Sequence, residues 1–294
     1  MAPPTDTEIA GSVLVSAMWW YAATVLSPAQ HLKRLGLFIP ASPLGELPRD
    51  VPRPGLGPRF SREHPRPVFL KGPARHRHLV EEFDHMADVY AEFVQPFSRP
   101  IFEEALEAMT PYLRPDSRVL DAGCGPGREM QQVARLVPQG EVIGIDLSAG
   151  MVRAAHAAVR ARGLSNCALF QADVGELPER FSGQFDLVYS CLAHHHYPEP
   201  GAAAAALFRC LRPGGVYCVC DPGPAWFTAM SAPLARWADP GWIGFHTPEQ
   251  FCDLFLRAGF ARAAWLEILP GFGLAVGQRA NGPTSPGSPS ARRK

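Results

Sequence analysis

The chain has 294 residues, of which 47% are hydrophobic and 19% are charged, so it can bury a large core and is not an intrinsically disordered tail. Its 28 basic and 28 acidic residues balance, which disfavours a protein that binds nucleic acid or anionic lipid through net charge. The seven cysteines are scattered and form no CxxC pair, a pattern typical of buried thiols in a reducing compartment. We therefore expect a cytoplasmic protein.

Residues 1–38 form a hydrophobic segment that we expect to be helical. No Lys, Arg, Asp or Glu occurs between Ile9 and Leu32, a length that could span a membrane. Polar residues such as Ser16 and Thr24 dilute this segment, however, and acidic residues precede it, so a membrane anchor is disfavoured. We expect a helix that is buried or covered by a partner, and one arrangement is a homodimer through this segment.

The flanks of the remaining chain have their own compositions. Residues 39–78 are rich in proline and arginine, and we expect an extended linker because proline neither sustains a helix nor donates to a sheet. Residues 280–294 are mainly Gly, Pro, Ser and basic residues, and we expect a disordered tail. The folded domain is therefore expected at residues 79–279.

Within this domain, short apolar runs alternate with longer helical patterns, which predicts an α/β fold with a mostly parallel sheet. Two apolar runs joined by a turn at residues 269–271 predict an antiparallel pair near the end. The expected strands are 118–121, 141–146, 168–171, 185–190, 215–221, 263–268 and 272–276, and the expected helices are 128–136, 149–162, 201–211 and 248–258.

The most informative segment runs from Val119 to Gly127, where an apolar strand leads into three glycines at alternate positions and then a helix. Such glycines let the chain turn sharply and let a ligand approach the backbone. The spacing GxGxG differs from the GxGxxG of dinucleotide-binding proteins, and Asp121 just before it would repel a pyrophosphate. The Asp121 carboxylate could instead accept a hydrogen bond from a cationic amino group.

Carboxylates also follow the next two strands. Asp146 ends one strand and could accept both hydroxyl groups of a ribose. Asp173 could accept a hydrogen bond from an exocyclic amine such as that of adenine, while Val174 or Leu147 packs against the base. The three acidic residues together suit one amino-acid nucleoside.

These motifs resemble those of the class I S-adenosylmethionine-dependent methyltransferases. The likeness covers residues 83–277 and is greatest to small-molecule enzymes related to quinone-biosynthesis methyltransferases, because Phe83, Asp84, Ala87 and Tyr90 match a helix motif of that group. It implies a Rossmann-like sheet of seven strands with a reversed last strand. It also implies S-adenosylmethionine as the cofactor and S-adenosylhomocysteine as its product. The matching segments are 119–127, 143–151, 171–174, 185–190 and 211–215.

The resemblance also implies roles for single residues. Tyr90 would lie over the cofactor, and Asp146 would hold its ribose. Each residue has a structural alternative, since Asp146 could cap the helix that begins near Ser148 and Asp173 could sit in an ordinary turn. The full set implied to bind the cofactor is Tyr90, Asp121, Ala122, Gly123, Cys124, Gly125, Gly127, Asp146, Leu147, Met151, Asp173, Val174, Ser190 and Cys191.

Three consecutive histidines, His194, His195 and His196, follow the strand at 185–190. Adjacent residues on an extended chain point to different sides and no spaced carboxylate completes a ligand set, so the sequence disfavours a metal site. Relatives in the family commonly carry the last two histidines, whereas His194 replaces an apolar residue. We expect one of the three to act as a general base, and a packing or capping role is the alternative.

Residues 222–247 form a long connection with many aromatic side chains, and we expect a lid over a flat or hydrophobic acceptor. The sequence thus predicts a methyltransferase that acts by in-line displacement on an oxygen or carbon atom of a small acceptor, with no nucleic acid as partner. An N-methyltransferase, a non-methylating protein that binds S-adenosylmethionine, and a nicotinamide-dependent oxidoreductase remain as alternatives.

Overall fold

A computed structural model of the chain describes residues 21, 25, 27–35, 57–64, 66–70, 76–93, 95–239 and 241–281. The expected N-terminal helix is therefore described only around Tyr21 and in α2 (Ser27–Arg34), and most of the expected tail lies outside the described residues. Among the helices that are described, none has the length and apolar character needed to cross a bilayer.

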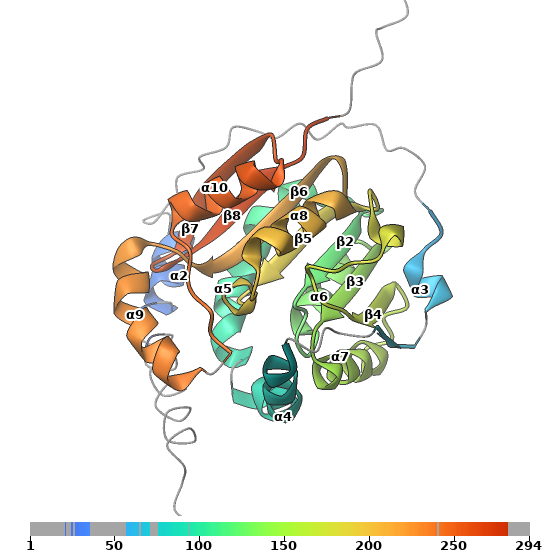
Figure 1. The fold of residues 1–294 in the computed structure, drawn as a ribbon, viewed down its shortest axis with the longest axis horizontal. Coiled ribbons are helices and arrows are strands. Elements are labelled where there is room, and N and C mark those ends of the chain that lie inside the picture. The colour runs from blue at the N-terminus through green and yellow to red at the C-terminus, as the bar shows by residue number, and fades with distance from the viewer. Residues whose placement is uncertain are drawn as a thin grey trace, which may run out of the picture.

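An eight-stranded sheet forms the centre of the molecule, in the order β1-β4-β3-β2-β5-β6-β8-β7 (Figure 1). Strand β8 is antiparallel to both β6 and β7, whereas the other neighbours are parallel. The α/β class and the reversed last strand are confirmed, and the strand number is corrected from seven to eight. The strands are β1 (Val68–Phe69), β2 (Arg118–Ala122), β3 (Glu141–Asp146), β4 (Cys167–Gln171), β5 (Phe185–Cys191), β6 (Leu211–Pro222), β7 (Arg262–Leu269) and β8 (Phe272–Gln278).

The additional strand comes from the segment that the sequence predicts to be an extended linker. Strand β1 pairs with β4, with Val68 opposite Phe170, and the short helix α3 (Phe60–Glu63) precedes it. A two-residue strand at the edge of a sheet needs few backbone donors, so the surrounding prolines do not prevent it. The buried Phe60 ring also packs against Phe170, at 5.9 Å between ring centroids.

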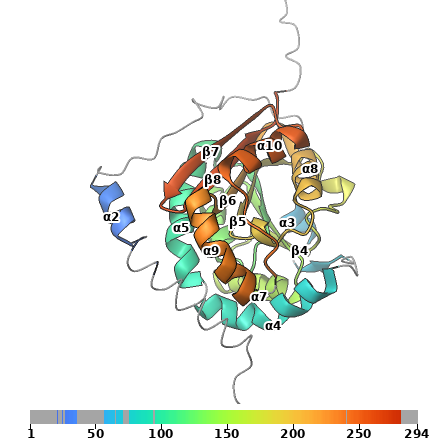
Figure 2. The same cartoon turned by 60° about the vertical axis from the view of Figure 1, so that its left-hand side comes forward.

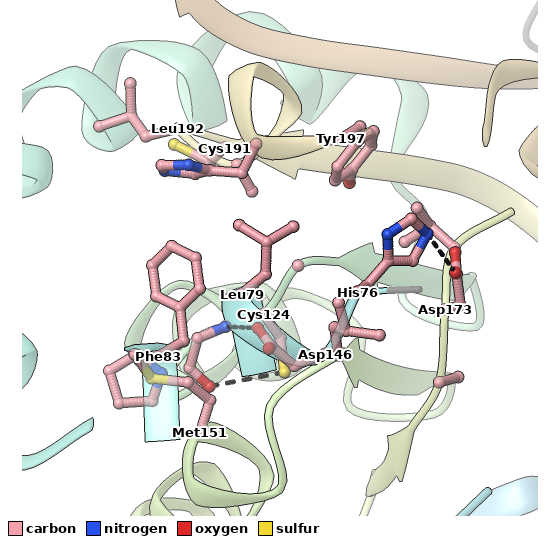
Figure 3. A pocket seen from close by; sticks show the side chains of 18 of the residues that line it. His76, Leu79, Phe83, Cys124, Asp146, Met151, Asp173, Cys191, Leu192 and Tyr197 are labelled. Atoms are coloured by element: carbon pink, nitrogen blue, oxygen red, sulfur yellow. Dashed lines mark hydrogen bonds and ion pairs between the residues drawn. The ribbon is translucent and has the colours of Figure 1, made fainter. Parts of the chain in front are cut away.

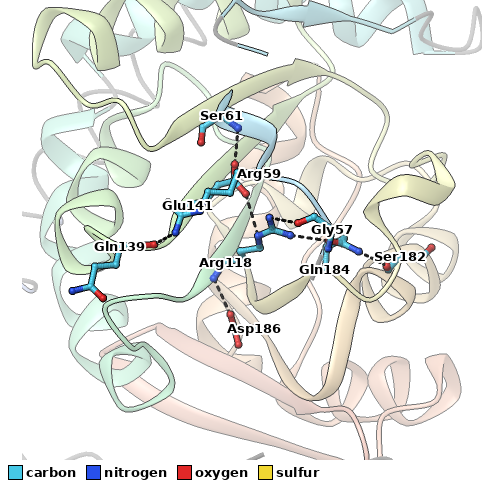
Figure 4. A network of polar contacts seen from close by, with 9 residues as sticks. All are labelled: Gly57, Arg59, Ser61, Arg118, Gln139, Glu141, Ser182, Gln184 and Asp186. Carbon is cyan, nitrogen blue, oxygen red and sulfur yellow. Dashed lines mark hydrogen bonds and ion pairs between the residues drawn. The ribbon is translucent and has the colours of Figure 1, made fainter. Parts of the chain in front are cut away.

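Charged groups hold this segment against the strands (Figure 4). The Arg118 guanidinium on β2 donates to the backbone oxygen of Gly57 at 2.7 Å and lies 3.3 Å from the Glu141 carboxylate. Glu141 in turn accepts a hydrogen bond from the backbone N–H of Ser61 at 2.5 Å. These contacts reach the buried Arg118 and Glu141 and so hold residues 57–63 against the folded domain, although Phe60 is the one buried side chain of the segment.

Helices cover both faces of the sheet, as the alternation of buried strand residues requires. On β2, Val119 packs into a cluster with residues of α5, α6 and α7, and Leu120 packs into a second cluster with residues of α3, α8 and α10. The longer helices are α4 (Arg77–Phe93), α5 (Gln95–Met109), α6 (Arg128–Leu136), α7 (Ala149–Ala161), α8 (Pro200–Cys210), α9 (Ala225–Ala238) and α10 (Pro248–Ala258), and the 3-10 turns are η3 (Thr110–Tyr112), η4 (Glu179–Phe181) and η5 (His194–His196).

Helix α4 lies between α9 and α7 at one end of the molecule (Figure 1), and the turned view keeps α4 and α9 close together (Figure 2). Helix α9 occupies most of the connection expected at residues 222–247. These helices therefore stand at the end of the sheet where the motif residues gather.

Candidate functional site

A cavity opens where strands β2, β3, β4 and β5 end (Figure 3). It holds about 920 Å³ of open space, including the part continuous with solvent. Its walls are mainly apolar, with a few carboxylates. Of the residues predicted from the sequence, the walls include Gly123, Cys124, Gly125, Asp146, Leu147, Met151, Asp173, Val174, Cys191 and His196.

The glycine turn after β2 forms one wall. Gly125 has a φ of +49°, which favours glycine, and a Cβ built there would meet no atom within 4 Å. A side chain at this position would stand in open space at the cavity wall, so glycine leaves room for a ligand to lie against the backbone. At Gly123 a Cβ would come 2.6 Å from the Ala193 Cβ, so that glycine is needed for packing.

Asp146 at the end of β3 is held by backbone donors. One carboxylate oxygen accepts a hydrogen bond from the N–H of Gly125 at 2.9 Å, and the other accepts one from the N–H of Ser148 at 2.9 Å. Burial outweighs these bonds and raises the pKa of Asp146 to about 6. Each oxygen has a second lone pair, so the carboxylate can still accept two hydroxyl groups.

Asp173 lies in the wall after β4. Its Oδ1 accepts a hydrogen bond from the N–H of Gly175 at 2.8 Å. Its Oδ2 is buried and has no hydrogen-bond partner among the described residues, although the His76 Nε2 lies 3.4 Å away. A buried acceptor that faces a cavity suits a ligand donor such as an amine.

Asp121 points away from the cavity. Its buried carboxylate accepts a hydrogen bond from the Tyr189 hydroxyl at 2.6 Å, and burial raises its pKa well above the ordinary value. The acidic side chain in the wall near the glycine turn is instead Glu129, at the start of α6, which accepts a hydrogen bond from Ser98 at 3.3 Å. The sequence signal for Glu129 is an acidic residue in the first turn of the helix that follows the glycines.

Other predicted residues lie behind the cavity wall. Ala122, Gly127 and Ser190 are buried, and Ala122 and Ser190 are both bonded to the Tyr197 hydroxyl, at 2.8 and 3.0 Å. Tyr90 belongs to α4, but its side chain lies outside the described residues.

Several wall residues were not predicted from the sequence. Helix α4 and the residue before it contribute His76, Leu79 and Phe83 to the cavity wall. Leu192 also lines it, with a φ of +50° that is unusual for a residue with a side chain. A local motif cannot reveal these positions, because packing between distant segments creates them.

The three histidines form the 3-10 turn η5 and are not extended, so that expectation is wrong. Because the turn curls, the rings of His195 and His196 lie side by side, with 4.1 Å between centroids. His194 is buried among Tyr197, His246 and Phe251, and neither of its nitrogens has a hydrogen-bond partner among the described residues. Burial lowers the pKa of His194 well below its ordinary value, so the ring is neutral.

Each ring of the pair has a partner at Nδ1. His195 Nδ1 lies 2.7 Å from the buried Asp221 carboxylate, and His196 Nδ1 lies 3.0 Å from the backbone oxygen of Gly241. Burial alone would lower the pKa of His195, but Asp221 raises it overall, whereas burial and the neighbouring His195 lower the pKa of His196 to about 4. His196 lines the cavity and therefore faces any second ligand there.

Asp239, directly after α9, adds a carboxylate to this pair. Its Oδ2 lies 3.8 Å from the His196 Nε2. Burial and the Asp239 charge raise the pKa of Glu82, on α4, to about 7. Two of the carboxylates near the histidines, Asp221 near the end of β6 and Asp239 directly after α9, were not predicted from the sequence as site residues.

Residues 119–215 match the sequence family described as "Methyltransferase domain". The chain contains a class I S-adenosylmethionine-dependent methyltransferase domain. Its cofactor is S-adenosylmethionine. The matched residues extend from β2 into β6 and include the glycine turn, Asp146 and Asp173.

The methyltransferase domain is similar to three curated proteins. It is 39% identical over 135 residues to trans-aconitate 2-methyltransferase of Deinococcus radiodurans, covering 46% of this chain and 48% of the relative. It is 36% identical over 143 residues to nocamycin O-methyltransferase of Saccharothrix syringae, covering 48% and 50%. It is 33% identical over 155 residues to the ubiquinone biosynthesis O-methyltransferase of Psychrobacter arcticus, covering 49% and 59%. The chain thus matches about half the length of these relatives.

Two solved structures share the fold. A methyltransferase in complex with the Trm112 activator of Haloferax volcanii has a TM-score of 0.56 at 18% identity, covering 68% of this chain and 98% of that one. The cyclase SpnF has a TM-score of 0.52 at 21% identity, covering 65% and 84%. Because one of these proteins is described as a cyclase, the fold alone does not decide the reaction.

Proposed function

We propose that the protein transfers the methyl group of S-adenosylmethionine to an oxygen or carbon atom of a small aromatic or hydrophobic acceptor. The observation that carries this proposal is the arrangement of Asp146, Asp173 and Glu129 around one cavity that also contains His196. Three carboxylates with different partners line this one cavity. The relatives support oxygen as an accepting atom, because two of them are described as O-methyltransferases.

The wall residues suit the parts of this cofactor one by one. The free lone pairs of Asp146 would accept the two ribose hydroxyl groups, and the buried Oδ2 of Asp173 would accept the adenine amine. Glu129 would pair with the ammonium group of the methionine part, beside the open backbone of Gly125. When bound, S-adenosylmethionine supplies an electrophilic methyl group on a positively charged sulfur.

The chain's own task is to position an acceptor and to help remove its proton. Leu79 and Phe83 give the cavity an apolar wall next to His196, whose ring lies 5.0 Å from the Phe83 ring. The histidine pair is therefore placed beside an acceptor, with His195 oriented by Asp221. Holding the reacting atoms collinear can account for several kcal/mol of the barrier, about 7–11 kcal/mol in the best intramolecular cases.

The test combines binding and turnover on the full chain. Calorimetry with S-adenosylhomocysteine should show one site per chain, and Asp146→Asn should weaken that binding at least tenfold while Asp253→Asn, an exposed position on α10, leaves it unchanged. S-adenosylmethionine with a deuterated methyl group, incubated with a simple catechol, should give a labelled product by mass spectrometry. Tight binding of a nicotinamide cofactor without any binding of S-adenosylhomocysteine would overturn the proposal.

The deuterated methyl group also distinguishes methyl transfer from the alternative, in which the protein binds S-adenosylmethionine without transferring its methyl group. If S-adenosylhomocysteine binds and the label never leaves S-adenosylmethionine with any acceptor that the protein binds, the domain uses the cofactor without transferring its methyl group. A His195→Ala variant that binds S-adenosylhomocysteine normally but turns over at least tenfold more slowly supports transfer assisted by the histidine pair.

A further inference from the structure

Three groups with lone pairs converge beside the cofactor cavity. One imidazole nitrogen from each of His195 and His196 and one carboxylate oxygen of Asp239 lie within 4.8 Å of one another. The side chains are 12%, 16% and 21% exposed, so the cluster is sheltered but open to solvent. The residues come from η5 and from the end of α9, which the fold brings together.

The hydrogen bonds of the two rings decide which nitrogen is available. A carbonyl oxygen only accepts, so the His196 Nδ1 that contacts the Gly241 oxygen carries the hydrogen. The same holds for the His195 Nδ1 against the Asp221 carboxylate. In a neutral ring the lone pair is then on Nε2. His196 Nε2 therefore presents a lone pair to the Asp239 carboxylate 3.8 Å away, and a cation between them would satisfy both.

This pattern is the one found around metal-binding histidines, which almost always donate their second ring N–H to a carboxylate or a backbone carbonyl. His195 has the carboxylate partner and His196 has the carbonyl partner. The loop is also held in place, because the Ile243 N–H donates to the backbone oxygen of His195 at 2.9 Å. The sequence disfavours a metal site because the histidines are expected to be extended and no carboxylate is apparent. In the fold the histidines form a 3-10 turn, and Asp239 supplies the carboxylate.

We infer that His195, His196 and Asp239 bind one divalent transition-metal cation at the edge of the cofactor cavity. Two imidazoles favour Zn²⁺, Fe²⁺, Ni²⁺ or Cu²⁺ over Mg²⁺, Ca²⁺ and Mn²⁺, which prefer oxygen ligands. The carboxylates of Asp239 and Asp221 together balance a double positive charge.

A bound cation would also restrict the chemical class of the acceptor. This step rests on the proposed function. Three protein ligands leave at least one position open on such a metal. His196 lines the cavity, so the open position faces the place of the acceptor. A hydroxyl group that binds there loses its proton to solvent more readily, as water does on a protein-bound zinc ion. The acceptor class is therefore an oxygen compound that can bind a metal, such as a catechol, an enol or a hydroxy acid.

The test uses the full chain, stripped with a chelator and then titrated with Co²⁺, whose visible absorption reports its ligands. The wild-type protein should bind one Co²⁺ per chain. Asp239→Asn should weaken binding at least tenfold, and Asp221→Asn, which removes the partner of His195, should weaken it by about 10–100-fold. Asp253→Asn is the matched control, because that exposed carboxylate on α10 pairs with Arg257. Circular dichroism and the thermal unfolding midpoint check that every variant is folded.

The inference is overturned if Co²⁺ gives no absorption change up to millimolar concentration, or if Asp239→Asn binds it as tightly as the wild type. Methyl transfer at full rate in the metal-free protein would likewise overturn the proposed role of the cation in binding the acceptor. Each of these results leaves the methyltransferase proposal standing, because that proposal is judged by S-adenosylhomocysteine binding and by the fate of the deuterated methyl group. Conversely, Co²⁺ binding without S-adenosylhomocysteine binding would remove the proposed function and keep the metal site.

Discussion

At the scale of single residues, the carboxyl group of Asp146 links cofactor binding to pH. Its pKa is about 6 in the free protein, above the usual value near ~3.9. Ribose hydroxyl groups donate to the ionised form and would lower this pKa on binding. We therefore expect calorimetry to show constant affinity for S-adenosylhomocysteine above pH 6 and an affinity that falls up to about tenfold per pH unit below it. An affinity in Asp146→Asn that falls just as steeply below pH 6 would assign the effect to another group.

The raised pKa of Asp146 also lowers the stability of the ligand-free protein at neutral pH. Because the carboxyl group is harder to ionise in the folded chain than in the unfolded chain, its contribution to stability is lost as the pH rises from about 4 to about 6. In the proposed complex, the cofactor would recover this loss by favouring the charged form of Asp146. Thermal unfolding with and without S-adenosylhomocysteine should therefore differ more at pH 7 than at pH 5.

Gly125 offers a second residue-scale test, because another glycine shares its geometry. Gly125 and Gly163 have positive φ angles, +49° and +64°, and a Cβ at either would meet no atom within 4 Å. Alanine at each should cost about 1–2 kcal/mol of unfolding free energy from backbone strain alone. Only Gly125→Ala should also weaken S-adenosylhomocysteine binding, by tenfold or more, since only that position lines the cavity. Equal affinity in the two variants would mean that the cofactor does not lie against this turn.

At the scale of elements, the segment before α4 depends on one buried arginine. Arg118→Met would leave the fully buried Glu141 carboxylate without its guanidinium partner and would remove the donor to Gly57. Breaking a buried ion pair costs about 3–5 kcal/mol, and we expect a loss of that size in urea unfolding. Arg257→Met, which breaks an exposed pair with Asp253, should cost no more than about 0.5 kcal/mol. A loss below 1 kcal/mol in Arg118→Met would show that residues 57–63 contribute little to the folded core.

The elements also show what a single sequence can and cannot reveal. Strands such as β3 and helices such as α6 could be predicted because buried strands are written as continuous apolar runs and helices by their period, both of which are local patterns. Strand β1 could not, because its two residues lie among prolines and owe their conformation to the neighbouring β4. For the site, Asp146 ends β3 and Asp173 follows β4, and Asp221 likewise stands at the end of a predicted strand. Asp239 follows a helix and reaches the histidines only through the fold.

At the scale of the whole molecule, the exposed face of α9 gives the last prediction. Its Phe227 is buried against Phe272, yet Trp226 and Trp237 are 56% and 53% exposed, which is unusual for tryptophan. The helix ends just before Asp239, which lies next to the histidine pair, and we expect α9 to act as a lid that covers these rings when an acceptor binds. Covering such a ring is worth about 1 kcal/mol or more, so Trp237→Ala should raise the KM for a methylated acceptor about fivefold.

Leu256 on α10 is equally exposed, at 53%, and Leu256→Ala is the control that should change nothing. Affinity for S-adenosylhomocysteine should be unchanged in both variants, because neither side chain lines the cavity. An unchanged KM in Trp237→Ala would mean that α9 does not close over the acceptor. In that case the tryptophans would not contact the acceptor, and Leu79, Phe83 and the histidine pair would recognise it.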